Sequence, residues 1–204
     1  MNPNLTGTKY IQLVTLITIS ILVSCRTETN KPQSPNIIYI LADDLGYGDI
    51  STYNANGKIN TPHIDRMALD GMKFTDAHTS SSVCTPTRYG ILTGRYNWRS
   101  PLKNGVLTGN SKALIPTSRT TVASLLKDQG YETAFIGKWH LGWNWGMKDS
   151  SIPHGEGWTD TDFENIDFTK PITNNPNGLG FDYAYGHAGS LDMAPYVYVE
   201  NGIA

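Results

Sequence analysis

The sequence predicts an α/β protein built on a mainly parallel sheet flanked by helices, and three observations support this fold class. Residues 36–42 form a continuous apolar run rich in β-branched side chains, typical of a strand buried on both faces. Residues 120–128 carry apolar side chains at helical spacing, and residues 131–136 alternate like a strand. Strands and helices that alternate along a chain favour a sheet connected by right-handed crossovers.

The first half of the chain contains four predicted elements. The strand at 36–42 ends at an aspartate pair, and a helix follows at 61–71, with proline near its start, apolar residues on one face and glycine at its end. Residues 73–77 are predicted to form a second strand. A short helix then follows Cys84 and ends at Gly94.

The second half contains one more predicted helix and strand, followed by a segment without a clear periodic pattern. Gly130 lies just past the helix predicted at 120–128, where a left-handed residue commonly ends a helix. The strand at 131–136 is followed by the polar segment 137–142. Residues 143–179 are rich in Gly, Pro, Asn and Asp without clear periodicity, which predicts a long surface excursion.

Composition restricts the function classes. The 204 residues carry a formal charge of −2, with 17% charged and 39% hydrophobic residues, as in an ordinary globular protein. Nothing is basic enough to indicate nucleic acid or another polyanion as a partner. The sequence stops at Ala204 without a clearly completed helix or strand, so we expect it to be the N-terminal part of a longer, truncated domain.

The N-terminus predicts export. Lys9 precedes an apolar stretch at 10–23 that is shorter than a membrane-spanning helix requires. Leu22-Val23-Ser24-Cys25 resembles the lipobox of bacterial lipoproteins, in which Cys25 would be lipidated and become the mature N-terminus. We therefore expect a lipoprotein signal peptide at 1–25, a polar tether at 26–35 and a catalytic domain at 36–204. An ordinary signal peptide with an incidental cysteine is the alternative.

That interpretation places the protein outside the cytoplasm, anchored to a bacterial membrane and facing the periplasm or the cell surface. An exported chain with two cysteines would normally suggest a disulfide between Cys25 and Cys84. If Cys25 is acylated and Cys84 has a chemical role, no disulfide forms in this stretch.

Three polar segments follow predicted strands, where ligands bind in open α/β sheets. The first is Asp43-Asp44, whose mutual repulsion a divalent cation with oxygen ligands would offset. An aspartate that only caps a turn is the alternative. The second is the Cys84 segment, and the third contains Lys138 and His140, although a histidine in such a loop can also be merely solvated.

The Cys84 segment has the features of a nucleophile site. Pro86 suits the first turn of a helix, which would leave Cys84 at the helix N-terminus, where backbone N–H groups favour an anion. Arg88 lies in the same turn and offers a planar set of donors to oxygen atoms. A buried structural cysteine before an ordinary helix is the alternative.

Cys84-Thr85-Pro86-Thr87-Arg88 resembles the Cys-x-Pro-x-Arg nucleophile motif of the sulfatase family, with Thr87 where the family most often has serine. Further segments resemble sulfatases in the family's order, namely 36–49, 61–74, 80–99, 121–142 and 180–190. The resemblance implies a fold like that of alkaline phosphatases. It also implies that Cys84 is oxidised by a maturation enzyme to formylglycine (3-oxoalanine), whose hydrated form attacks the sulfur of a sulfate ester.

The resemblance also implies roles for other residues. Asp43, Asp44 and modified Cys84 match calcium ligands, and calcium would polarise the sulfate. Arg88 matches the arginine that steadies the hydrated aldehyde. Two further residues, Lys138 and Ser190, match groups that contact the sulfate, and His140 matches a base near the diol. The family's remaining calcium and sulfate ligands lie beyond position 204.

These residues predict a sulfuric ester hydrolase that cleaves sulfate monoesters, with a sulfated glycan as the expected substrate. One alternative is a phosphonate or phosphodiester hydrolase, since relatives on this fold share the metal site and sometimes the aldehyde nucleophile. The other is an inert glycan-binding surface lipoprotein in which Cys84 remains a thiol.

Overall fold

The computed structural model describes residues 34–152 and 163–204. The chain divides into two units, 1–42 and 43–204, which are considered separately. The predicted signal peptide, its lipidation residue Cys25 and residues 26–33 of the predicted tether lie outside the described residues. Within the described residues, no helix combines the length and apolar character needed to cross a membrane.

The strand predicted at 36–42 is not formed. These residues adopt neither helix nor strand, and the side chains of the run are exposed, with Ile38 at 84% and Ile40 at 76%. An apolar run becomes a strand only when a neighbouring strand satisfies its backbone groups. No described strand pairs with this segment.

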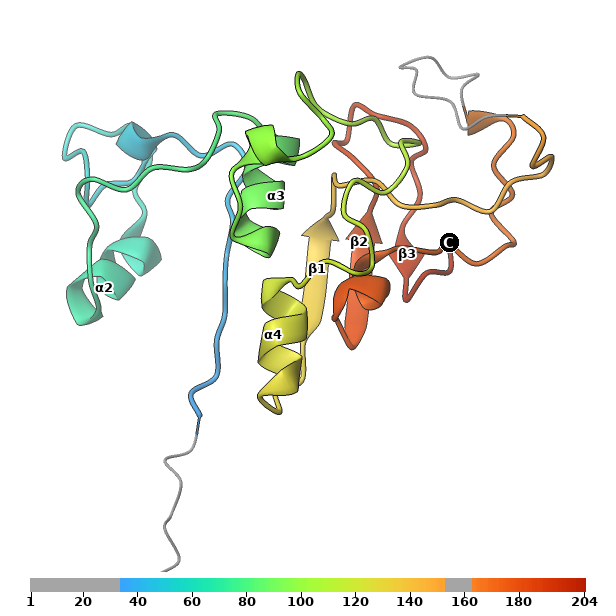
Figure 1. The fold of residues 1–204 in the computed structure, drawn as a ribbon. Helices are drawn as coiled ribbons and strands as arrows, with labels where there is room; N and C mark the ends of the chain where they lie inside the picture. The colour runs from blue at the N-terminus through green and yellow to red at the C-terminus, as the bar shows by residue number, and fades with distance from the viewer. Residues whose placement is uncertain (1–33, 153–162) are drawn as a thin grey trace, which may run out of the picture. The chain divides into compact units, whose positions relative to one another are not determined.

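The second unit contains a three-stranded mixed sheet in the order β1-β2-β3 (Figure 1). β1 (Ala134–Lys138) pairs in parallel with β2 (Tyr183–His187), and β3 (Val199–Glu200) pairs antiparallel with β2. The strand predicted at 131–136 therefore begins three residues later and includes Lys138 as its last residue. Together with the helices, this sheet confirms the α/β fold class.

Two glycines set how closely β1 and β2 approach. Gly137 and Gly186 face each other in the register of the two strands. A Cβ atom placed on Gly186 would lie 1.8 Å from the Gly137 carbonyl oxygen, so no larger residue fits there without moving the backbone. Gly137 also has a φ of +110°, which side chains rarely tolerate. This pair fixes the end of β1 that leads into His140.

The three predicted helices form as α2 (Pro62–Asp70), α3 (Cys84–Thr93) and α4 (Val122–Asp128). α3 ends at Gly94, whose φ of +63° gives the left-handed cap that its sequence predicts. At the start of α4 the Thr121 hydroxyl accepts a hydrogen bond from the Ser124 amide at 3.1 Å. Short 3-10 helices lie at Tyr47–Asp49 (η1), Asn97–Arg99 (η2) and Pro176–Leu179 (η4).

One of two further predictions in the first half is confirmed and the other is wrong. α2 forms as predicted, and its apolar face is exposed, with Met67 at 65% and Leu69 at 82%. Residues 73–77 contain no strand. Their backbone takes part in single contacts instead, such as the hydrogen bond that Tyr53 Oη donates to the Phe74 carbonyl at 2.9 Å.

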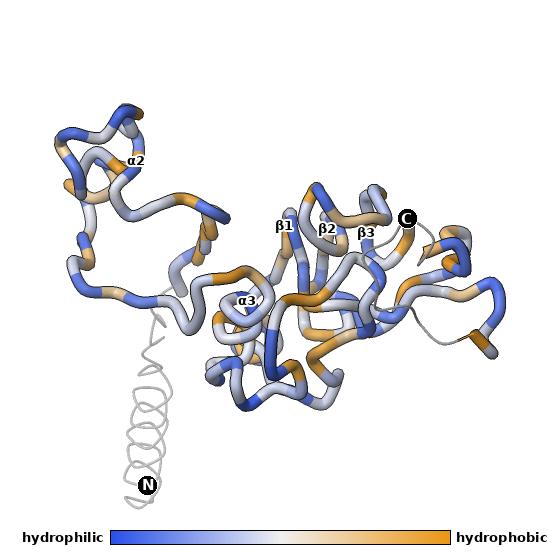
Figure 2. Tube along the Cα trace, turned by 90° about the horizontal axis from the view of Figure 1, so that it is seen from above, coloured by the Kyte–Doolittle hydropathy of each residue, from blue (hydrophilic) through white to orange (hydrophobic). Residues whose placement is uncertain are grey.

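The core lies around β1 and the segments that follow it. Trp139, Leu141, Trp143 and Trp145 are all at most 4% exposed. Ile166, Ile172 and Leu179 join them, and apolar stretches (orange in Figure 2) run along the loops near β1 to β3. The prediction of a surface excursion over 143–179 is therefore wrong for these positions, since aperiodic spacing does not prevent large side chains from being buried.

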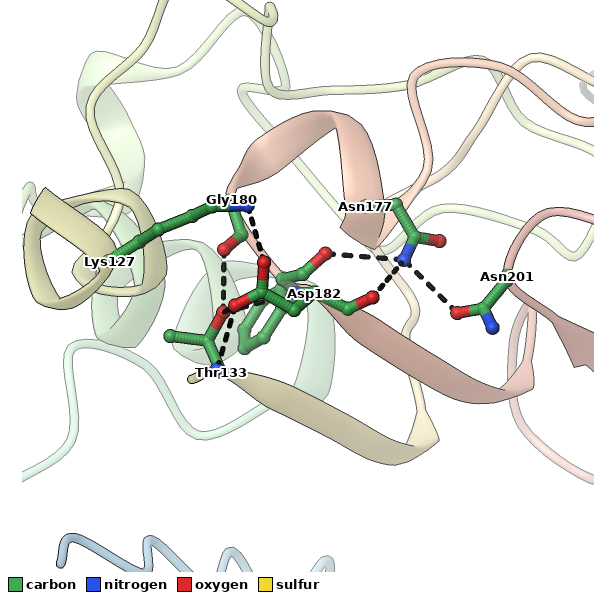
Figure 3. Close-up of polar contacts among 7 residues, drawn as sticks. Lys127, Thr133, Asn177, Gly180, Asp182 and Asn201 are labelled. Carbon is green, nitrogen blue, oxygen red and sulfur yellow. Dashed lines mark hydrogen bonds and ion pairs between the residues drawn. The ribbon is translucent and has the colours of Figure 1, made fainter. Parts of the chain in front are cut away.

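Asp182 joins α4, β1 and the start of β2 (Figure 3). Its Oδ1 lies 2.5 Å from Lys127 Nζ, and its Oδ2 accepts hydrogen bonds from the Thr133 amide and hydroxyl, both at 3.0 Å. Asn177 Nδ2 donates to the Asp182 carbonyl at 3.5 Å and to Asn201 Oδ1 at 3.2 Å. The hydrogen bond with Lys127, followed by those from Thr133, lowers the pKa of Asp182.

Asp182→Asn should make the protein less stable at neutral pH, and by a smaller amount in acid. Because the pKa of Asp182 is lower in the folded than in the unfolded chain, its contribution is present above the unfolded value of about 4 and disappears as pH falls through the folded value. Thermal unfolding followed by circular dichroism should show Tm lowered by about 2 °C at neutral pH, and a difference that becomes smaller as the pH falls below about 4.

Asp128→Asn is the matched control, because Asp128 is an exposed aspartate at the end of α4. It should leave Tm unchanged or raise it slightly, since a carboxylate is unfavourable at a helix C-terminus. A difference between wild type and Asp182→Asn that stays as large in strong acid as at neutral pH would contradict the role assigned to the Asp182 carboxylate.

Candidate active site

The carboxyl ends of β1 and β2 bring together residues that are far apart in the sequence. Beyond the last ladder pair, the Trp139 amide donates to the His187 carbonyl at 3.0 Å, and the His140 amide donates to the Ala188 carbonyl at 2.9 Å. The two strands thus stay side by side through His140. Ser190 follows two residues after Ala188, so its segment leaves the sheet beside that of His140.

Cys84 is the first residue of α3, as the sequence predicts. Val83 is the N-cap residue with extended backbone, and its carbonyl accepts a hydrogen bond from the Thr87 amide at 3.3 Å. Cys84 is a free, partly exposed thiol, while Thr85, Pro86 and Thr87 behind it are buried. The buried residues fix the backbone of the first turn, and the thiol is left accessible at the helix N-terminus.

Arg88, Lys138 and Asp43 form a compact charged cluster. Asp43 Oδ2 lies 2.8 Å from Arg88 Nη2 and 2.8 Å from Lys138 Nζ. The Asp43, Arg88 and Lys138 side chains are only 13%, 12% and 18% exposed. Arg88 Nη1 also donates to the Lys138 carbonyl oxygen. The planar guanidinium therefore holds a carboxylate and the end of β1 at the same time.

The two aspartates have opposite pKa shifts. A hydrogen bond with Asp44 and the contacts with Lys138 and Arg88 lower the pKa of Asp43, although burial opposes this change. The same hydrogen bond and the negative charge of Asp43 raise the pKa of Asp44. When the pair carries one proton, Asp44 holds it.

His140 is completely buried, at 0% exposure, and its backbone φ is +53°. Its Nε2 lies 2.7 Å from the Leu107 carbonyl oxygen. Its Nδ1 is buried and has no hydrogen-bond partner among the described residues. Burial is the main reason that the pKa of His140 is lowered, so the ring is neutral at neutral pH.

Thr85 and Leu107 are site residues that the sequence did not reveal. Thr85 Oγ1 donates to the His140 carbonyl at 2.9 Å and accepts a hydrogen bond from the Leu107 amide at 3.2 Å. These partners lie 55 and 22 residues away in the chain. No local pattern predicts such distant contacts from a variable motif position. The hydrogen bond of the His187 ring, by contrast, is local, since its Nδ1 lies 2.6 Å from the carbonyl of Gly189, two residues along the chain.

The donor set fits part of a calcium shell. Asp43 and Asp44 provide neighbouring carboxylates, the hard oxygen ligands that Ca²⁺ prefers. A full shell needs about six to eight oxygens, and no group of three or more His, Cys, Asp or Glu residues suited to a metal occurs within residues 34–152 and 163–204. The described residues therefore suit one side of a calcium ion rather than its whole shell.

A second fit concerns modified Cys84. Arg88 Nε, an N–H donor, and His140 Nδ1 are both buried without a hydrogen-bond partner in the described part of the chain. Buried polar atoms are normally satisfied, so Arg88 Nε can still donate a hydrogen bond to an added group and His140 Nδ1 can still accept one. A hydroxyl group can take either role.

Comparison with known proteins identifies the family. The sulfatase family model matches residues 35–201. The chain is 43% identical over 189 residues to an N-acetylgalactosamine-6-O-sulfatase of Bacteroides thetaiotaomicron, covering 90% of this chain and 33% of the relative. It is 42% identical over 164 residues to human steryl-sulfatase, covering 78% of this chain and 24% of that protein.

Solved structures agree with these relatives. A protein from work on the metabolism of multiple glycosaminoglycans by Bacteroides thetaiotaomicron matches with a TM-score of 0.71 and 45% identity, covering 84% of this chain and 32% of the other. Ps i-CgsB in complex with k-i-k-neocarrahexaose matches with a TM-score of 0.58 and 33% identity, covering 78% and 29%. The chain spans about a third or less of these relatives, and on the family match it belongs to the sulfatase family.

Proposed function

We propose that this protein hydrolyses sulfate monoesters, with Cys84 converted to formylglycine as the nucleophile. The observation that carries the proposal is the position of Cys84 at the N-terminus of α3, one turn before Arg88 in the Asp43–Arg88–Lys138 cluster. The sulfatase relatives, which share this segment of sequence, support it. The N-terminus of α3 and two cationic side chains favour an anionic ester at this point.

Each charged residue has a separate task in this proposal. Arg88 keeps its position through Asp43 and the Lys138 carbonyl, and its unpartnered Nε donates to a hydroxyl on residue 84. The Lys138 ammonium, which lies 2.8 Å from Asp43, stabilises negative charge on the transferring sulfate. Ser190, in the segment beside His140, contacts the sulfate oxygens.

His140 acts as the proton acceptor. Its ring is neutral because burial lowers its pKa, and a neutral imidazole can take up a proton. Nε2 is already bonded to Leu107, so Nδ1 is the nitrogen that accepts. It would remove a proton from a hydroxyl of residue 84, the step by which the sulfate is released.

Two groups complete the proposed chemistry. Formylglycine supplies a hydrated aldehyde, which offers two hydroxyl groups where a cysteine offers one thiol. Asp43, Asp44 and a hydroxyl of residue 84 would hold calcium, which would supply positive charge to polarise the sulfate. The carboxylate pair and the two unpartnered site atoms support these assignments.

The proposed substrate is a sulfated glycan. One relative is an N-acetylgalactosamine-6-O-sulfatase, and one structural neighbour was solved with k-i-k-neocarrahexaose. The proposed partners are this glycan and a maturation enzyme that forms formylglycine. Export, followed by anchoring through lipidated Cys25, would place the protein where such polysaccharides occur.

Peptide mass spectrometry of the protein from its native host tests the modification. The peptide that contains Cys84 should be about 18 Da lighter than its unmodified form, because sulfur is replaced by oxygen with a small loss of hydrogen. Cys84→Ala is the control and should show only the alanine mass. A thiol at position 84 in all host material would refute the proposed nucleophile and favour an inert glycan-binding protein.

Substrate preference tests the reaction class. The protein purified from that host should hydrolyse an aryl sulfate faster than an aryl phosphodiester, and Cys84→Ala should lower the aryl sulfate rate by at least about 10³-fold. Preference for the diester would identify a phosphodiester hydrolase on the same scaffold. Turnover that survives in Cys84→Ala would show that another group is the nucleophile.

Membrane fractionation tests the anchor. Cys25→Ala should move the protein from the membrane to the soluble fraction, because the only proposed lipid attachment is lost. Thr27→Ala leaves Cys25 in place and should remain with the membrane. If Cys25→Ala stays in the membrane fraction, lipidation at this residue is not what anchors the protein.

A further inference from the structure

Deepening the proposed function, on which this inference rests, we infer that Thr85 is a positioning residue that fixes the orientation and tautomer of His140. Thr85, Leu107 and His140 form a closed ring of three hydrogen bonds. Thr85 Oγ1 donates to the His140 carbonyl at 2.9 Å, the Leu107 amide donates to Thr85 Oγ1 at 3.2 Å, and His140 Nε2 lies 2.7 Å from the Leu107 carbonyl.

The ring determines which nitrogen of His140 carries the proton. A carbonyl oxygen only accepts hydrogen bonds, so the Nε2 that faces Leu107 must carry the hydrogen. In a neutral imidazole Nδ1 then has a lone pair and no proton. Since the residue is 0% exposed, bulk water does not compete with the Leu107 carbonyl for Nε2. Nδ1 is thereby reserved as the acceptor.

Thr85 connects the two ends of this arrangement. Its hydroxyl accepts a hydrogen bond from the Leu107 amide and so fixes the backbone of Leu107. The carbonyl of that residue is the acceptor for His140 Nε2, so its position depends on Thr85. The same hydroxyl holds the His140 backbone. Thr85 is fully buried and directly follows Cys84, so it ties the base to the helix turn that carries the nucleophile. Without the hydroxyl, two backbone groups lose their partner.

The test compares three variants of the protein purified from its native host. Thr85→Val removes the hydroxyl at nearly constant shape, and Thr85→Ser keeps it. Thr93→Val is the matched control, because Thr93 lies in the same helix and its hydroxyl makes the same two kinds of hydrogen bond. It donates to the Tyr89 carbonyl at 2.6 Å and accepts from the Arg95 amide at 3.3 Å. It has no contact with His140.

Two measurements are made on each protein. Histidine ring ¹⁵N spectra, with the His140 signals assigned by their loss in His140→Gln, report which nitrogen is protonated. Steady-state kinetics with an aryl sulfate report kcat and KM. Because Thr85 lies inside the maturation motif, kcat is divided by the formylglycine fraction found by mass spectrometry.

Wild type, Thr85→Ser and Thr93→Val should show His140 protonated at Nε2, with kcat similar among them. Thr85→Val should show a mixture of tautomers and a kcat lowered by about 10- to 100-fold, with KM within about 2-fold, because the base is misplaced rather than the substrate. Wild-type His140 protonated at Nδ1 would overturn the inference even if Thr85→Val does not fold.

A Thr85→Val protein with the wild-type spectrum and wild-type kcat would also overturn it, as would an equal loss of kcat in Thr93→Val. Different results would refute the proposed function and the positioning role of Thr85. Wild-type protein without aryl sulfatase turnover would refute the proposed function, while the ¹⁵N spectra would still decide whether Thr85 sets the tautomer of His140.

Discussion

The parallel pairing of β1 with β2 is the constraint on which the site depends. It continues past the ladder to His140 and Ala188, and the Gly137–Gly186 contact sets how closely the strands can approach. Lys138 and His140 are therefore placed by backbone hydrogen bonds rather than by a flexible loop. Since paired residues of the two strands, such as Ala134 and Tyr183, lie about 50 residues apart in sequence, the site exists only when this long-range pairing has formed.

Helix α3 is attached to the same strand end by two of its own side chains. Arg88 Nη1 donates to the Lys138 carbonyl, and Thr85 Oγ1 donates to the His140 carbonyl. Thr85 and Arg88 are three residues apart, so they lie on one face of the helix. Both residues are part of the nucleophile motif. The motif thus does more than present Cys84, because it also joins the helix of the proposed nucleophile to the strand end that carries the lysine and the histidine.

Local signals predicted the helices well, because helix-ending and helix-starting residues act over a few positions, as Gly94, Gly130 and the proline of α2 show. The strand at 36–42 was predicted from its apolar run, but a strand also needs a partner, and none is described for it. The buried Trp143 and Trp145 were missed because irregular segments have no period to reveal burial. Of the predicted site residues, only Lys138 lies at the end of a strand that forms. Asp43 and Arg88 were singled out after segments that form no strand, and family resemblance pointed to them. The Thr85–Leu107–His140 ring depends on contacts that no sequence pattern encodes.

The charge balance of the cluster explains why these residues suit an anionic ester. One carboxylate, that of Asp43, is shared by two cations, Arg88 and Lys138, in side chains that are all less than 20% exposed. Partial burial weakens the screening by water, so the two cationic side chains act strongly on a nearby anion. The same carboxylate offsets the electrostatic repulsion between the two cations. Asp43 therefore assembles the cluster, and Arg88 and Lys138 are the side chains that offer positive charge to an anion.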